Sequence, residues 1–426
     1  MRLVYKFRLT DDRLREELLV LCRYSKDLYN QTLYTIRTEL DKNNKWLSYY
    51  DLNNIMQTTY NTDNEINYRK LKTQVAQQTI KTVSQNVSSY VKSIKQWKKH
   101  PEEYTAMPKF PRYLNKKGYF QLTYTNQCST IKDGKIYFSK TLFINIPQYD
   151  KYEECIKNYQ QIRIIPKKNG RVIWVEIVYD VADSNPELDY KEFASIDLGL
   201  NNLVTLVSST GNPVIYNGRQ IKAANQYMNK RISILKSKLA TDNSKGMAHP
   251  IQKSKQTDKI YDDRNNLIND MMHKVSRHIV NYLIKNKIGT LVVGYNKGWK
   301  DSINIGKVNN QTFVGIPFSN LINMLKYKCE RAGIILMTNE ESYTSKCDSL
   351  AMEEICKHDE YKGMRVKRGL YQSSTGKLIN ADVNGALNIL RKVVGDSDVI
   401  HRIIDSGLLF NPVKYRNLFK LDGCGL

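Results

Sequence analysis

The chain has 426 residues, and its 66 Lys and Arg against 42 Asp and Glu give a formal net charge of +24. This length allows two or three domains with buried cores, and this charge favours a polyanion such as nucleic acid as the partner. The sequence has no apolar run of spanning length, signal peptide or lipidation motif, so we expect a cytoplasmic protein and no membrane partner.

The first 180 residues carry a strand pattern, then two helical patterns, then strand patterns again. Residues 2–9 alternate basic and apolar side chains, which predicts a half-buried strand. Apolar side chains recur at helical spacing over residues 18–36 and 75–94, and both stripes are explained as the core of a helical bundle. Short apolar runs over residues 120–178 predict several strands. We therefore expect a small basic β-barrel or sandwich interrupted by helices, a form suited to clamping nucleic acid.

Residues 108–118 form a basic loop between these helices and strands. Two prolines break the helical pattern there. The loop carries four basic side chains, Lys109, Arg112, Lys116 and Lys117. Cations in a loop are suited to phosphate contacts, so these four are candidate nucleic-acid-binding residues.

The second half of the chain has the pattern of an α/β domain. A polar, proline-containing segment at residues 183–187 is typical of a domain junction. A strand that ends in Asp197, a hairpin and a third strand then begin a ribonuclease H-like fold, and Gly199 permits the tight turn that leaves Asp197 at the sheet edge. The strands are expected at residues 193–197, 203–208, 214–216, 290–294 and 334–337, and the helices at 220–240, 258–287 and 318–332.

Acidic residues begin or end three of these elements. Asp197 closes the first strand, Glu340 and Glu341 follow the strand at 334–337, and Asp382 opens a helical run. Two Mg²⁺ ions about 4 Å apart can activate a water and stabilise the leaving oxygen of a phosphodiester, which requires hard oxygen ligands from distant parts of the chain. Taken alone, each acid is explained more simply as a helix cap or strand-end residue. Together they are candidate ligands of a two-metal site.

Several segments occur in a specific order along nearly the whole chain. They are residues 108–111, 117–120, 196–199 (Ile-Asp-Leu-Gly), 290–300, 341–346 (Glu-Ser-Tyr-Thr-Ser-Lys) and 379–389. In this order they resemble TnpB, the RNA-guided nuclease of bacterial insertion sequences and a relative of type V CRISPR effectors. The resemblance implies an α/β plus β-barrel architecture: a RuvC-like, ribonuclease H-like nuclease domain, and an amino-terminal wedge-type β-barrel that carries a helical insert.

The resemblance also implies partners, cofactors and domain boundaries. The implied partners are a guide RNA and double-stranded target DNA, the implied cofactor is Mg²⁺ as two ions, and the oligomeric state is left open. The implied domains are a wedge-type β-barrel at 1–10 and 105–182, a helical recognition insert at 11–104, a RuvC-like domain at 188–345 and 377–395, a small nucleic-acid-binding insert at 346–376, and a basic tail at 396–426. We expect the chain after Lys392 to be a flexible arm.

This sequence departs from the family at one catalytic position. Most members carry a glutamate on the strand at 290–294, where this chain has Gly294. Some members and their eukaryotic relatives, the Fanzors, use a relocated glutamate just before the Tyr-Thr-Ser-Lys motif, and Glu341 matches that position. Neighbouring strand residues point to opposite faces, so Glu340 is the lesser candidate. The implied catalytic residues and metal ligands are therefore Asp197, Glu341 and Asp382.

A second departure concerns zinc. The family usually has two Cys-x-x-Cys pairs between the Thr-Ser-Lys motif and the final Asp. Here only Cys347, Cys356 and His358 lie in that segment, and the seven scattered cysteines of the chain are expected to be reduced thiols. We expect the insert at 346–376 to hold together without zinc. Its candidate nucleic-acid-binding residues are Lys346, Arg365, Lys367 and Arg368.

Three functions remain open on this sequence. The first is an RNA-guided, Mg²⁺-dependent DNA endonuclease associated with a transposable element. The second is a nuclease-inactive, RNA-guided DNA-binding repressor, which the missing acid at 294 favours if Glu341 faces away from the metals. The third is a transposase that joins DNA ends directly, since a ribonuclease H-like fold supports both cutting and strand transfer.

Overall fold

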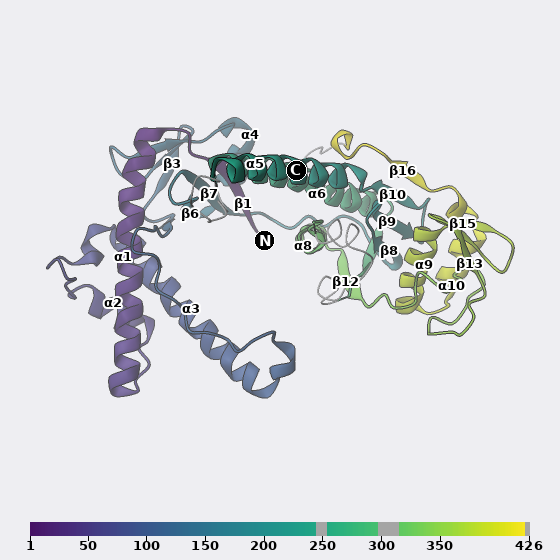
Figure 1. Cartoon of the computed structure of the whole chain (residues 1–426), viewed down its shortest axis with the longest axis horizontal. Helices are drawn as coiled ribbons and strands as arrows, with labels where there is room; N and C mark the ends of the chain where they lie inside the picture. Colours follow the sequence, from purple (N-terminus) through teal and green to yellow (C-terminus); the bar gives the residue numbers. More distant parts are fainter. Residues whose placement is uncertain (244–253, 297–314, 422–426) are drawn as a thin grey trace. The chain divides into compact units, whose positions relative to one another are not determined.

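The computed structural model describes residues 1–243, 254–296 and 315–421. The end of the motif at 290–300 therefore lies outside the described residues. The chain divides into two compact units, Met1–Ala182 and Asp183–Leu426. Figure 1 colours the first unit purple to blue and the second teal to yellow. None of the described helices is long and apolar enough to cross a bilayer.

The first unit contains two antiparallel sheets. The larger has the order β1-β7-β6-β2 and consists of β1 (Arg2–Arg8), β7 (Val172–Asp180), β6 (Tyr159–Lys167) and β2 (Leu122–Thr125). The smaller consists of β3 (Thr130–Lys132), β4 (Lys135–Tyr137) and β5 (Phe143–Asn145). Among the described strands β1 and β2 lie at opposite edges of the larger sheet and do not pair with each other, so the hydrogen bonds of this sheet do not close into a ring, and the wedge-type barrel stays a prediction.

Helices complete the core of this unit. They are α1 (Asp12–Asn43), α2 (Tyr49–Met56), α3 (Thr73–Lys99) and α4 (Tyr149–Ile156). Asp11 caps α1 by accepting a hydrogen bond from the Leu14 backbone N–H, and Ser48 with Asp51 forms a capping box at α2. The predicted apolar stripes of α1 and α3 are buried against both sheets in one continuous core. The helices of the insert and the two sheets therefore share one hydrophobic core.

The second unit is built on a six-stranded mixed sheet of order β12-β11-β8-β9-β10-β16. Its strands are β8 (Asp189–Leu198), β9 (Asn202–Ser208), β10 (Val214–Asn217), β11 (Ile288–Gly294), β12 (Ile335–Asn339) and β16 (Val413–Tyr415). Strands β8, β9 and β10 form an antiparallel meander, and β11 and β12 continue the sheet in parallel beyond β8. The patterns predicted these strands, apart from β16, and the β8–β9 hairpin; they did not predict the order of the strands in the sheet.

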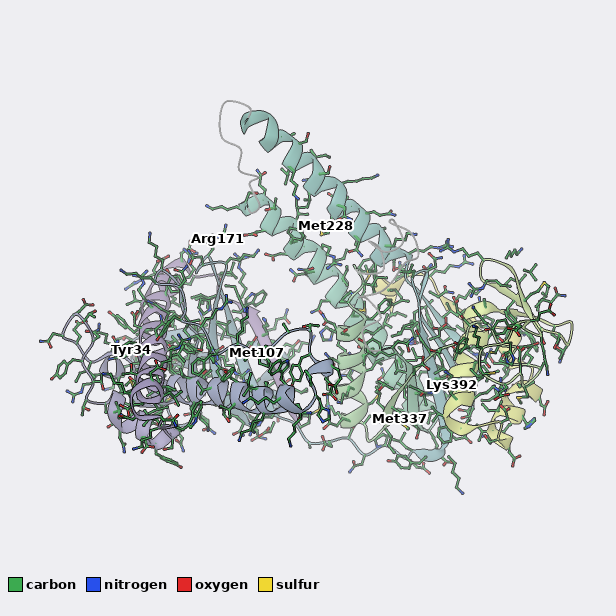
Figure 2. The ribbon with its side chains drawn as sticks, turned by 60° about the horizontal axis from the view of Figure 1, so that its bottom comes forward. Tyr34, Met107, Arg171, Met228, Met337 and Lys392 are labelled. Carbon is green, nitrogen blue, oxygen red and sulfur yellow. The ribbon has the colours of Figure 1, made fainter. Side chains whose placement is uncertain are left out.

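Helices cover both faces of this sheet. They are α5 (Arg219–Asn243), α6 (Lys255–Lys285), α8 (Phe318–Arg331), α9 (Ala381–Val394) and α10 (Asp398–Asp405). Leu291 and Val293 of β11 pack with α6 and α8, whereas Val292 packs with α9 and α10 on the opposite face. Figure 2 shows α5, on which Met228 is labelled, and α6 running side by side away from the sheet.

The chain after Lys392 is not a free arm in its described part. Helix α10 buries Ile400 and Ile403 beside α9, and β16 pairs in parallel with β10 at the sheet edge. Leu418 and Leu421 then enter the core of α6 and α8. The expectation of a flexible arm was wrong because it rested on charge, whereas apolar residues spaced along the tail bury themselves on the domain.

A buried lysine lies between α6 and α8. The Lys328 ammonium donates hydrogen bonds to the His273 carbonyl at 2.8 Å and to Ser276 Oγ at 2.6 Å. Burial, with help from the positive charge of Arg277, lowers the pKa of Lys328 to about 7. An unfolded lysine holds its proton to about pH 10.4. Between these two values the unfolded state binds more protons, so this residue makes stability rise with pH there.

Lys328→Met is therefore expected to raise the free energy of unfolding by about 1–3 kcal/mol at pH 6.5 and by less at pH 9.5. The exposed neighbour Lys326→Met is the matched control, with no pH-dependent change. Thermal and urea unfolding at the two pH values measure the difference. An equal effect at both pH values would contradict burial of the charge.

Candidate functional site

Asp197 lies near the end of β8, on the face that α9 covers. Ala194 and Ile196 belong to the core on the other face, so alternation places Ser195 and Asp197 toward α9. Ser195 Oγ donates to the Ala386 carbonyl at 2.6 Å. A Cβ atom at Gly385 would lie 3.1 Å from Asp197 Oδ2, so the glycine allows the helix to approach the carboxylate closely.

Asp382 lies in the first turn of α9. Asn380 caps this helix by accepting hydrogen bonds from the backbone N–H groups of Asp382 and Val383 at 3.0 and 3.3 Å. Asn202 Nδ2, at the start of β9, donates to Asp382 Oδ2 at 2.6 Å. The carboxylate is thus fixed beside the β8–β9 hairpin that carries Asp197.

Glu341 reaches the same region from the neighbouring strand pair. In the sheet register Ile196 of β8 is opposite Val293, and Gly294 is opposite Asn339, the last residue of β12. A Cβ atom at Gly294 would lie 2.8 Å from Glu341 Oε2. The Glu341 carboxylate therefore occupies the space that a side chain at position 294 would need.

The two glutamates after β12 have different surroundings. Glu341 Oε2 is buried and has no hydrogen-bond partner in the part of the chain that the structure describes, and the Glu341 backbone N–H donates to Asn296 Oδ1 at 3.1 Å. Glu340 is exposed and its carboxylate lies 3.1 Å from the ammonium of Lys392, which Figure 2 labels on α9. The structure thus directs Glu341 inward and Glu340 outward.

Two of the acids act on Asp197 through their negative charges. Burial and the negative charges of Asp382 and Glu341 raise the pKa of Asp197 well above its usual value, and only the Arg365 guanidinium and a backbone hydrogen bond oppose the shift. Burial and the charge of Glu340 raise the pKa of Glu341 to about 7. Within the described ranges no three His, Cys, Asp or Glu side chains stand close enough to ligate one ion as they are. A buried oxygen without a partner and mutual repulsion nevertheless fit a bound cation.

Two buried asparagines hold the loop after Glu341 against α9. Asn384 Oδ1 accepts hydrogen bonds from the Ser349 N–H and hydroxyl, and its Nδ2 donates to the Cys347 carbonyl. Asn388 Nδ2 donates to the carbonyls of Thr344 and Cys347 at 2.9 and 2.7 Å. Both side chains are fully buried on the same face of the helix. They connect the helix of Asp382 to the loop of Glu341.

Our sequence analysis did not single out Asn202, Asn384 and Asn388 as site residues. The spacing of the last two did carry a signal, because polar residues four apart inside an otherwise apolar helix need buried partners. For Asn202 no local signal exists, since its partner Asp382 is 180 residues away in the chain.

The basic loop at 108–118 is fixed to α1 by its backbone. Asn30 exchanges two hydrogen bonds with the backbone of Leu114, and Arg37 donates to the Pro111 carbonyl at 2.7 Å. The Arg37 guanidinium also lies over the rings of Phe110 and Tyr113. The four candidate residues Lys109, Arg112, Lys116 and Lys117 are all exposed. The loop therefore presents its cations from an ordered backbone.

The insert at 346–376 carries the second group of candidates. It contains β13 (Met364–Lys367) and β14 (Leu370–Gln372), and β15 (Leu378–Asn380), which follows the insert, completes a three-stranded sheet with them. Lys346, Arg365, Lys367 and Arg368 are exposed. Arg365 lies near enough to the acids for its charge to act on Asp197. The insert thus brings at least one cation to the carboxylates.

A buried carboxylate connects the two ends of this insert. Asp348 is fully buried, and its Oδ2 accepts hydrogen bonds from the Ser373 hydroxyl and from the Ser374 N–H and hydroxyl at 2.7–3.0 Å. Glu353 accepts from the backbone N–H groups of Asp348 and Lys362. The six cysteines in the described residues form no disulfide, and Cys347 Sγ lies 3.6 Å from the Cys356 carbonyl.

Asp348→Ala is expected to destabilise the insert by about 3 kcal/mol, because several buried donors would lose a charged acceptor. Hydrogen exchange of the backbone N–H groups at 346–376 should rise, whereas Asp359→Ala, an exposed acid of the same insert, should leave it unchanged. Addition of a chelator should not mimic the Asp348 variant. Loss of protection with chelator alone would show that a metal holds the insert.

Known proteins resemble this chain over the regions that carry the acids. A family model described as a probable transposase matches residues 176–300, and one described as the Cas12f1-like TNB domain matches residues 318–389. TnpB-like protein ORF457 of Acidianus two-tailed virus is 24% identical over 205 residues, 47% of this chain and 42% of the relative. The CRISPR-associated endodeoxyribonuclease Cas12f1 of Sulfoacidibacillus thermotolerans is 25% identical over 233 residues, 53% of this chain and 52% of the relative.

By these matches the chain is similar to TnpB-like proteins and to the type V effector Cas12f1. It spans about half the length of these two relatives. The cryo-EM structure of a Cas12f1–sgRNA–target DNA complex superposes on this TnpB relative with a TM-score of 0.57 at 16% identity, covering 89% of this chain and 83% of that one. This similarity identifies a RuvC-type fold with mixed α/β content.

Proposed function

We propose that this TnpB relative is an RNA-guided, Mg²⁺-dependent DNA endonuclease associated with a transposable element. The proposal is carried by the charges of Asp382 and Glu341, which act on the buried Asp197, and by Glu341 Oε2, which is buried and has no hydrogen-bond partner among the described residues. Mutual repulsion between carboxylates is costly in an empty site, and it is relieved when divalent cations are shared between them. The three carboxylates are the proposed catalytic residues and metal ligands.

The proposed division of labour follows from the surroundings of each side chain. Two Mg²⁺ ions held by the carboxylates would activate a water and stabilise the leaving oxygen of a phosphodiester. Asn202 keeps the Asp382 carboxylate in place, and Asn384 and Asn388 keep the loop of Glu341 on the helix. These amides position ligands and do not take part in the reaction.

We assign nucleic-acid binding to the exposed cations of the two units. The loop residues Lys109, Arg112, Lys116 and Lys117, with the helices of the first unit as a recognition insert, are proposed to bind guide RNA or its duplex with DNA. Lys346, Arg365, Lys367 and Arg368 are proposed to bind the DNA strand near the carboxylates. The relatives support this assignment, because a Cas12f1 complex holds both a single-guide RNA and target DNA.

Two other functions are distinguished by one experiment. The protein is purified with its native RNA and offered a matched duplex with randomised flanking bases and Mg²⁺. Cleavage next to a short flanking motif supports the endonuclease, and binding without cleavage supports the inactive repressor that the glycine at 294 suggests. Joining of DNA ends without RNA supports the transposase. If an exchanged guide segment left the preferred target unchanged, RNA guidance would be excluded.

Binding to non-target DNA is expected to be mainly electrostatic. Each Lys or Arg that neutralises a phosphate releases a counterion, so affinity should fall by about 10³-fold or more between 50 and 200 mM salt if about six phosphates are contacted. Fluorescence anisotropy of a labelled non-target duplex measures the slope. A shallow slope would contradict the assignment of the +24 net charge to phosphate binding.

A further inference from the structure

A basic pocket of about 420 Å³ lies beside the carboxylates in the second unit. Its lining includes Asn202, Asn217, Arg219, Asn380, Lys414 and Arg416. Asn202 donates to Asp382, and Asn380 caps the helix on which Asp382 lies. Two of the lining residues therefore also hold Asp382 or the helix that carries it.

The tail of the chain supplies Lys414, Tyr415 and Arg416 to the lining of the pocket. Lys414 lies opposite Ile215 in the parallel pairing of β16 with β10. The Tyr415 ring stacks on Tyr216 with ring centres 5.5 Å apart. Just beyond, Gln220 Oε1 accepts a hydrogen bond from the Leu418 N–H at 2.7 Å. Lys414 and Arg416 are thus held on an ordered strand and its continuation.

The chemistry of the pocket favours a nucleotide. Arg219, Lys414 and Arg416 are exposed, and the described structure gives none of them a carboxylate partner. Three unpaired cations beside amide side chains match a backbone phosphate with an adjacent base or sugar. The pocket volume lies in the range of small-ligand sites.

We propose that this pocket is a subsite for the nucleotide that flanks the cleaved phosphodiester of the DNA strand. Arg219, Lys414 and Arg416 hold its phosphate, and Asn217 contacts its sugar or base. Because Asn202 joins the pocket to Asp382 by a 2.6 Å hydrogen bond, a nucleotide held there sets the position of the next phosphate over the carboxylates. The inference rests on the proposed nuclease function, but the pocket can be tested without cleavage.

The first test measures binding in the full chain with Asp197→Ala, in chelator. A short labelled single-stranded DNA is titrated against this background and against the same background with Lys414→Gln and Arg416→Gln. We expect about tenfold weaker binding and a salt slope smaller by about one to two phosphate contacts. The matched control, Lys285→Gln with Lys420→Gln, removes two exposed lysines outside the pocket and should leave binding unchanged.

The same titration with single-stranded RNA distinguishes the source of the nucleotide. Weaker DNA binding in the pocket variant supports the proposal. An unchanged DNA affinity, or a loss confined to RNA, overturns it. Both altered side chains are exposed, and unchanged thermal unfolding verifies that the variants fold.

The second test uses cleavage by the protein loaded with guide RNA. Neutral methylphosphonates replace single phosphates around the cut site, and in the unaltered protein one flanking position should raise KM about tenfold. In the variant with both Lys414→Gln and Arg416→Gln, the methylphosphonate at that position should raise KM little further, because the contact with the phosphate is already lost. Additive effects would overturn the subsite. Absence of cleavage in the unaltered protein, together with the expected binding loss, would refute the nuclease function and leave the nucleotide subsite standing.

Discussion

Asp197→Ala is expected to abolish DNA cleavage while binding of guide RNA and target DNA stays close to that of the unaltered protein. Removal of a carboxylate between two divalent cations takes several kcal/mol from transition-state stabilisation, which corresponds to a loss of about 10³-fold or more in rate. Binding persists because it depends on the exposed cations and on base pairing. Single-turnover cleavage and anisotropy with the same matched duplex measure the two effects separately.

A stability measurement shows whether the loss reflects chemistry or misfolding. The pKa of Asp197 is raised, so the folded state binds a proton more tightly than the unfolded state, and this residue lowers stability as pH rises above about 3.9. Asp197→Asn should therefore unfold at a higher temperature than the unaltered protein at pH 7.5 in chelator, with a smaller gain at pH 4.5. A variant that cuts at a near-normal rate would refute the two-metal assignment.

Glu341→Gln is expected to reduce cleavage as severely as Asp197→Ala, whereas Glu340→Gln should have an effect of no more than about threefold. The two residues are adjacent, carry the same charge and undergo the same chemical change, so they form a matched pair. In the described structure Glu341 has a buried oxygen without a hydrogen-bond partner, whereas Glu340 pairs with Lys392 at the surface. Cleavage rates at saturating Mg²⁺ compare them directly.

The pattern of results identifies the third acid. Equal damage in both variants would point to a general charge effect, and damage only in Glu340→Gln would move the assignment by one residue. Glu341→Gln should also weaken the dependence of unfolding temperature on Mg²⁺, which reports metal binding without cleavage. If neither glutamate affected cleavage, the acid missing at 294 would have no replacement at these positions.

Periodicity alone predicted the long elements of this chain. The stripes of α1 and α3 and the strands β8, β9 and β11 were expected within a few residues, because each buries a repeating set of apolar side chains. Short elements such as α4 and β16 were not expected. The three residues of β16 are too few to show the alternation of a strand. Their pairing with β10 also depends on a tail that folds back onto the domain.

The candidate site was predictable to a different degree for each residue. Asp197 and Asp382 stand at the ends of strongly patterned elements, where functional carboxylates are recognisable. The choice of Glu341 over Glu340 depended on a family resemblance and on strand alternation, although β12 ends at Asn339, before both. The hydrogen bond between Asn202 and Asp382 could not be predicted, since the start of β9 and the first turn of α9 come together only when the domain folds.

The missing Cβ at position 294 restricts how this protein can change. The ideal Cβ position lies 2.8 Å from Glu341 Oε2 and 2.5 Å from Ile389 Cδ1, and Ile389 is fully buried. A side chain at 294 and an inward Glu341 are therefore alternatives for one volume. The single substitution Gly294→Glu therefore cannot place an acid on β11 while Glu341 stays in its inward position, because the new side chain would displace the Glu341 carboxylate. If the acid moves between position 294 and position 341 during evolution, the intermediate sequence has either both acids in one crowded volume or neither acid.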